Sequence, residues 1–133
     1  MLIMPSRFID RVGLQTTPSA SGTGLLYMDI QAFHYNTNGV VHGGALFTLA
    51  DTGMGMALYE QLAPDERCAT IDIKINYLRP VTGGRVVCTS TVVHKGRSTA
   101  YLECTLTAND KLVARASGTF AIFVPEPSPT SSR

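Results

Sequence analysis

The sequence lacks the features of several common classes of protein. No stretch of five or six like charges occurs among its 133 residues, and 11 Lys and Arg oppose 10 Asp and Glu, which leaves a formal net charge of +1. A concentrated basic face for nucleic acid is therefore absent. No apolar run reaches the roughly 18 residues that span a bilayer, and residues 1–5 do not resemble a signal peptide. We predict a cytoplasmic protein that binds neither nucleic acid nor a membrane.

The cysteines and histidines are not spaced as in a metal site or a disulfide framework. Cys68, Cys88 and Cys104 are far apart, contain no C-x-x-C pair and lie among apolar residues, which favours reduced, buried thiols. His34 and His94 have no Cys or His partner at ligand spacing, so we predict no metal site.

The length and composition indicate one folded domain. Hydrophobic residues make up 44% and charged residues 16% of the chain, which is enough to bury a core in a single unit of this size. Residues 124–133 contain three prolines and four Ser or Thr, a composition typical of a loose tail. We therefore expect one domain over residues 1–123 and a flexible tail over 124–133.

One long helix is predicted from residue 43 to about residue 62. Its apolar residues cover almost the whole circumference, and such a helix is normally buried on all sides. Gly53 and Gly55 each cost roughly 1 kcal/mol in helix propensity, and Gly53 forms a stripe of small residues with Ala50 and Ala57. A close approach of another backbone would explain that cost.

The other segments alternate between apolar and polar residues, as strands with one buried face do. In residues 68–78, for example, Ala69, Ile71 and Ile73 fall on one face and Thr70 on the other. A sheet curled around the one helix, an α+β layout, follows from this order. The predicted elements are a short helix at 5–11 and strands at 12–17, 22–33, 68–78, 85–94, 99–108 and 112–123, with a turn at 18–22.

Asp51 is the charged residue inside the apolar helix. Burying an aspartate is costly unless it is hydrogen-bonded, metal-bound or protonated, and a carboxylate removed from water binds a proton more readily, which suits a general base. The alternative is that Asp51 faces a solvent gap or satisfies backbone groups.

The run His42-Gly43-Gly44 places two glycines at the start of this helix. Free backbone N–H groups and the positive end of the helix dipole point outward there and can hold an oxyanion. The run is a weak signal by itself, but Asp51 lies two helical turns further on, and the combination is stronger.

These residues resemble the signature of hot-dog-fold acyl-CoA thioesterases of the PaaI-like (phenylacetate-pathway) type, in the 4-hydroxybenzoyl-CoA thioesterase superfamily. The resemblance covers about residues 24–123. Its motifs are Asn36-x-x-Gly39-x-x-His42-Gly43-Gly44, Leu49-Ala50-Asp51, Thr70-Ile71-Asp72-Ile73-x-x-x-Tyr77-Leu78-Arg79-Pro80 and His94-Lys95-Gly96-Arg97.

The resemblance implies a hot-dog fold, in which a curved antiparallel sheet of about five to six strands wraps one long helix. It implies hydrolysis of an acyl- or aryl-acyl-CoA thioester without a cofactor, because coenzyme A is part of the substrate. It also implies dimers whose sheets join side by side, doubled into tetramers, with active sites at the dimer interface. Asp51 would then work with residues of the partner subunit.

The resemblance assigns a role to each residue of the site. Asp51 is the general base or the nucleophile, and Gly43 N–H polarises the thioester carbonyl. Asn36 holds that carbonyl or the attacking water, His42 has an orienting role, and the Thr70 hydroxyl helps to place the water. For His42 the alternative is a cap of the helix start, and for Thr70 an ordinary strand position.

The resemblance also indicates the residues that bind the substrate. The turn of Lys95, Gly96, Arg97 and Ser98 is expected to meet the nucleotide end of coenzyme A, since cations and backbone N–H groups suit phosphates. A solvated basic turn is the alternative. The other expected binding residues are Gly44, Arg79 and, in the acyl pocket, Leu46, Met54 and Met56.

Two other functions remain open for this fold. One is a module that binds acyl-CoA without hydrolysing it, against which the intact set of Asn36, Gly43 and Asp51 argues; the other is a hydratase or dehydratase. An aspartate at position 51, where a menaquinone-pathway branch carries glutamate, favours the phenylacetate-like branch. The acyl group, and the choice between coenzyme A and a carrier protein, are left open.

Overall fold

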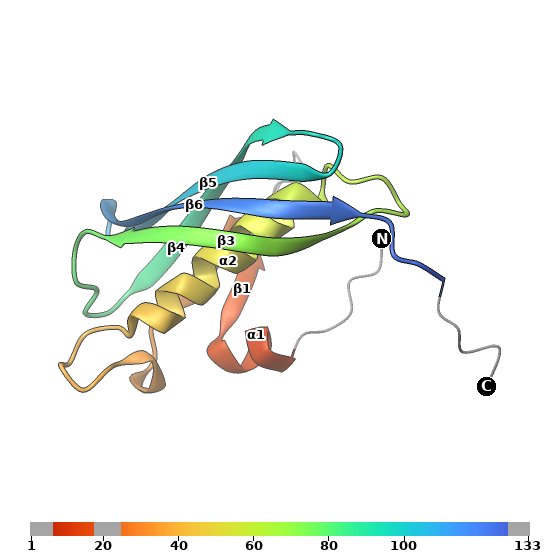
Figure 1. The fold of residues 1–133 in the computed structure, drawn as a ribbon. Coiled ribbons are helices and arrows are strands. Elements are labelled where there is room, and N and C mark those ends of the chain that lie inside the picture. The colour runs from red at the N-terminus through yellow and green to blue at the C-terminus, as the bar shows by residue number, and fades with distance from the viewer. Residues whose placement is uncertain (1–6, 18–24, 128–133) are drawn as a thin grey trace.

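The computed structural model describes residues 7–17 and 25–127. A single long helix lies against a sheet, as Figure 1 shows. The elements are α1 (Arg7–Val12), β1 (Leu14–Thr17), β2 (Leu25–Asp29), the 3-10 helix η1 (Ala32–His34), α2 (Gly43–Tyr59), β3 (Arg67–Tyr77), β4 (Arg85–Lys95), β5 (Thr99–Ala108) and β6 (Lys111–Phe123).

The predicted elements occur in the predicted order, with shifted ends. The helix α2 ends at Tyr59 rather than near residue 62. The strand β2 ends at Asp29 rather than at residue 33, because the chain turns into η1, where His34 Nδ1 accepts a hydrogen bond from Gln31 N–H at 2.8 Å. The predicted turn at 18–22, residues 22–24 of the predicted strand, residues 5–6 of the predicted first helix and residues 128–133 of the predicted tail lie outside the described residues.

All six strands of the described residues pair antiparallel, in the order β1-β2-β4-β5-β6-β3. The hairpin between β5 and β6 turns on Asn109 and Asp110, whose φ angles of 52° and 62° suit a tight two-residue turn. The crossover that carries β3 to the far side of β6 makes it an edge strand. Its backbone is therefore open on one side in a single subunit.

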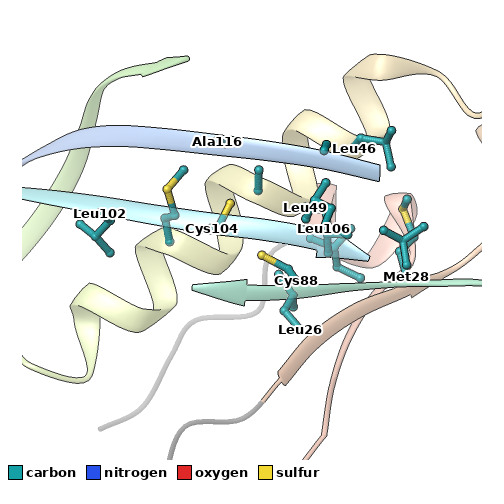
Figure 2. Packing of buried hydrophobic residues seen from close by; sticks show 14 of the residues in the cluster. Leu26, Met28, Leu46, Leu49, Cys88, Leu102, Cys104, Leu106 and Ala116 are labelled. Carbon is teal, nitrogen blue, oxygen red and sulfur yellow. The ribbon is translucent and has the colours of Figure 1, made fainter. Parts of the chain in front are cut away.

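The core lies between α2 and the concave side of the sheet. Leu46 and Leu49 of α2 belong to one buried cluster with Leu26 of β2, Cys88 of β4 and Leu106 of β5. Figure 2 labels all five and shows Leu49 beside Leu106. The face of α2 toward the sheet is buried as its apolar composition predicts, but Phe47, Met56 and Ala57 are half-buried. The prediction of burial on all sides is therefore wrong for the single subunit. No helix among the described residues is long and apolar enough to cross a membrane.

The two helix glycines differ in their surroundings. A Cβ atom on Gly53 would lie 2.4 Å from Cys88 Sγ, whereas one on Gly55 would meet Phe120 at 3.8 Å, an ordinary contact. A close approach therefore exists at Gly53, where α2 packs on β4, but the nearest atoms are side-chain atoms of Cys88 and Ser90 rather than the predicted backbone. At Gly55 no close approach exists.

A bulge in β3 corrects the predicted alternation of that strand. The pairing with β6 shifts between Thr70 and Asp72, so Ile71 is an extra residue. Ile71 is 57% exposed, while Ile73 packs against the core. The prediction that Ile71 and Ile73 share a face is wrong, because a bulge reverses the faces on either side of it.

Candidate active site

The bulge directs Thr70 toward α2 and Asp51. Thr70 Oγ1–H donates a hydrogen bond of 2.7 Å to Asp51 Oδ1. Without the extra residue, Thr70 would share the outward face of Asp72 and Lys74 and could not reach the helix. Strand and helix thus bring together two residues that the sequence separates by 19 positions, and Asp51 Oδ1 receives a donor while the carboxylate stays half-buried.

His42 caps the start of α2. Its Nδ1 accepts a hydrogen bond of 2.8 Å from Gly44 N–H, and its carbonyl accepts those of Ala45 and Leu46. Gly43 N–H has no hydrogen-bond partner among the described residues. This N–H therefore remains available, at the positive end of the helix dipole, for an acceptor outside the chain. The alternative reading of His42 as a helix cap agrees with this geometry.

Asn36 shapes the loop that leads into α2. Its side-chain Oδ1 accepts hydrogen bonds from Asn38 N–H at 2.8 Å and Val40 N–H at 3.3 Å. The amide nitrogen of the same side chain has no partner in the part of the chain that the structure describes. The oxygen thus holds the loop, and the NH₂ group is the part of Asn36 left to bind a ligand.

Two residues near the site were not found by sequence reasoning. Cys68 lies two residues before Thr70 on β3; burial, and secondarily the negative charge of Asp51, raise the pKa of its thiol. Tyr77, at the other end of β3, donates its hydroxyl to Gly43 carbonyl oxygen at 2.8 Å. Cys68 had been predicted as a buried thiol, yet it is half-buried, whereas Cys88 and Cys104 are buried; all three are free.

The predicted substrate-binding residues do not lie together in one subunit. Leu46 and Met54 are in the core, with 3% and 0% of their surface exposed. Gly44 is exposed at the helix start. Arg79 follows β3 and, with Lys111, lines a surface hollow of about 270 Å³.

The turn of Lys95, Gly96, Arg97 and Ser98 joins β4 to β5. The register pairs Thr70 with Phe120, Phe120 with Ala100, and Ala100 with Lys95. The turn therefore lies at the same end of the sheet as Thr70, three strands away from β3, and far from the start of α2 (Figure 1).

A separate cavity of about 190 Å³ lies between α2 and β4. Gly53, Met56, Ala57 and Glu60 line it from the helix, and their spacing puts them on one helix face. Asp51 precedes Gly53 by two residues, about 200° around the helix. The cavity and Asp51 are therefore on opposite faces of α2.

The sequence pattern of the thioesterase superfamily matches residues 38–114. Acyl-coenzyme A thioesterase 13 of Homo sapiens is 33% identical over 102 residues, which cover 73% of this chain and 71% of that protein.

Two solved structures share the fold. The conserved protein PA5202 from Pseudomonas aeruginosa superposes with a TM-score of 0.84 and 38% identity, covering 90% of this chain and 96% of that one. A mutant of the phenylacetic acid degradation protein PaaI from Thermus thermophilus gives a TM-score of 0.77 with 26% identity, over 87% and 98% of the two chains. These likenesses confirm the predicted hot-dog fold.

Proposed function

The chain belongs to the thioesterase superfamily and is a thioester hydrolase, and we propose that it cleaves an acyl- or aryl-acyl-CoA thioester into the free acid and coenzyme A. The observation that carries the proposal is a carboxylate, Asp51, oriented by the Thr70 hydroxyl on a helix whose first N–H group, that of Gly43, is unpaired among the described residues. A base or nucleophile and an oxyanion donor are the two groups that acyl transfer requires.

In the proposed reaction the carbonyl oxygen of the thioester accepts a hydrogen bond from Gly43 N–H. Asp51 either takes a proton from water, which attacks the carbonyl carbon, or attacks that carbon itself. In both cases negative charge develops on the carbonyl oxygen, where the helix dipole stabilises it. The C–S bond then breaks, the thiolate leaves, and it takes up a proton to become the thiol. When water is the nucleophile, the free acid forms directly. When Asp51 is the nucleophile, the acyl group remains on its carboxylate as a mixed anhydride, which water hydrolyses to the free acid and Asp51. Asn36 NH₂ holds the carbonyl or the water.

The positions of Gly43 and Asp51 support a site shared between two subunits. Eight residues separate them on α2, a rise of about 12 Å. Both groups must lie about 3 Å from one reacting centre, and an Asp side chain spans only part of the difference. We propose that Gly43 of one subunit works with Asp51 of its partner.

The edge strand β3 is the proposed dimer interface. It is 11 residues long and open along one side, and it exposes 57% of Ile71. Long edge strands with exposed apolar side chains tend to pair with another strand. Two β3 strands side by side would join the sheets, and we expect such dimers to double into tetramers.

The name of the human relative and that of the Thermus protein support an acyl-CoA or aryl-acyl-CoA substrate. We propose that the turn of residues 95–98 binds the phosphates of coenzyme A, because its cations are exposed. Arg79 is exposed at the other end of β3, beyond Tyr77 and Gly43, so in the proposed shared site it would come from the subunit that supplies Gly43. The reaction needs no cofactor in this proposal, and cytoplasmic localisation stays a prediction.

The test is thiol release from phenylacetyl-, benzoyl-, hexanoyl- and palmitoyl-CoA. Asp51→Asn keeps the shape of the side chain, and we expect it to lower kcat by about two to four orders of magnitude. Asp10→Asn is the matched control, since it removes the same charge from an exposed position on α1, away from β3 and α2. An Asp51→Asn variant that is folded and fully active would refute the role of Asp51. Binding of the four esters without thiol release would favour a binding module. The hydratase alternative needs an enoyl ester, so crotonyl-CoA is added to the panel, and loss of its double bond without thiol release would favour a hydratase.

A further inference from the structure

Tyr77 and Gly43 make a contact that the mechanism above does not yet use. Tyr77 ends β3 and Gly43 begins α2, at the same side of the molecule (Figure 1). The hydroxyl donates to Gly43 carbonyl oxygen at 2.8 Å. A Cβ atom on Gly43 would lie 3.2 Å from both Cζ and the hydroxyl oxygen of Tyr77. The tyrosine ring therefore occupies the space that a side chain at position 43 would need.

The hydrogen bond between Tyr77 and Gly43 is not explained by the need of a buried phenol for a partner. Tyr77 is 49% exposed, so water could serve its hydroxyl equally well. A tyrosine hydroxyl is protonated at neutral pH and able to donate, and partial burial raises the pKa of Tyr77 still further. The hydrogen bond therefore matters for the position of Gly43 rather than for the solvation of Tyr77.

Side chains hold the first two residues of α2 from two directions. His42 Nδ1 accepts from Gly44 N–H at 2.8 Å, and a Cβ atom on Gly44 would lie 2.9 Å from that nitrogen. Tyr77 holds the carbonyl of Gly43. Each glycine thus makes room for a neighbouring side chain, and both bonds hold the same peptide group, that between Gly43 and Gly44. The unpaired N–H of Gly43 belongs to the preceding peptide group, whose carbonyl, that of His42, accepts from Ala45 and Leu46. The peptide groups on both sides of the Gly43 Cα atom are therefore held.

We infer that Tyr77 is a positioning residue for thioester hydrolysis: by holding the Gly43 carbonyl and packing its ring on Gly43, it fixes the direction of the N–H that binds the oxyanion. The inference rests on the proposed function. It gives β3 two tasks, because the strand that orients Asp51 through Thr70 also orients Gly43 through Tyr77. One edge strand thereby aligns both reacting positions of α2.

Tyr77→Phe removes the hydroxyl and keeps the ring. We expect kcat to fall about 10- to 100-fold, since small misplacements of a catalytic group have effects of this size. KM should stay within about twofold, because contacts to the rest of the substrate are unchanged. Tyr27→Phe is the matched control: its hydroxyl donates to Gln15 Oε1 at 2.8 Å between β1 and β2, at the other edge of the sheet. Equal kcat values for the two variants would overturn the inference.

A readout that does not depend on turnover is the backbone amide signal of Gly43 in ¹⁵N-labelled protein. We expect Tyr77→Phe to shift this signal and to speed its hydrogen exchange, and Tyr27→Phe to leave it unchanged. An unchanged Gly43 signal in Tyr77→Phe would show that the Tyr77 hydroxyl does not orient Gly43. If the wild-type protein had no thioesterase activity, the proposed function would be wrong, and the role of Tyr77 in catalysis with it. A shifted Gly43 signal in Tyr77→Phe would still show that Tyr77 contacts Gly43.

Discussion

Replacing Gly53 by alanine is expected to destabilise the protein, whereas the same replacement at Gly55 is expected to stabilise it. Both glycines lie inside α2, so both alanines gain the same helix propensity, about 1 kcal/mol. They differ in the space around the added methyl group. At Gly53 it would lie 2.4 Å from Cys88 Sγ and 3.1 Å from Ser90 Oγ, and at Gly55 it would lie 3.8 Å from Phe120.

The contacts set the size of each effect. Overpacking a core costs about 1–3 kcal/mol, so the free energy of unfolding of Gly53→Ala should fall by up to about 2 kcal/mol after the gain in propensity. Gly55→Ala should gain about 1 kcal/mol. Because the propensity is common to both, the difference between the two variants, about 1–3 kcal/mol, isolates the packing of α2 on β4.

Urea unfolding at one fixed protein concentration measures both variants, since the stability of an oligomer depends on concentration. Adding Cys88→Ala to each variant is the further control, because it removes the sulfur atom that the methyl group would meet. The second change should reduce the cost of Gly53→Ala and leave the gain of Gly55→Ala unaltered. Equal stability of the two single variants would refute the close approach of α2 to β4 at Gly53.

Two further predictions concern the surroundings of Asp51. Thr70→Ala removes the donor to Asp51 Oδ1, and we expect kcat to fall roughly tenfold while Thr70→Ser, which keeps the hydroxyl, stays near wild type; equal activity of both in steady-state assays would contradict an orienting role. Cys68 should react slowly with iodoacetamide at pH 8, because burial and the charge of Asp51 raise its pKa and only the thiolate reacts. Asp51→Asn removes that charge, lowers the pKa and should speed the alkylation; an unchanged rate for the Cys68 peptide in mass spectrometry would show that the two groups do not interact.

The sequence by itself determined the elements and the candidate groups. Alternation and apolar circumference are local patterns, so they predict the strands, the long helix and the α+β class without any knowledge of pairing. They also single out Asp51, the acid within an apolar helix, and the glycines at the helix start. The family resemblance added the fold and the reaction, and the comparisons confirmed the fold and thioester hydrolysis in general.

Only the tertiary structure decided which residues meet. The bulge at Ile71 depends on the register between β3 and β6, and no alternation within β3 alone reveals it, yet it directs Thr70 to Asp51. Tyr77 belonged to the matched motif, but its bond to Gly43 joins residues 34 positions apart. Contacts of this kind depend on strand order and on how the helix lies across the sheet. The sequence therefore names the groups that can carry the chemistry, and the packing of β3 against α2 sets their orientation.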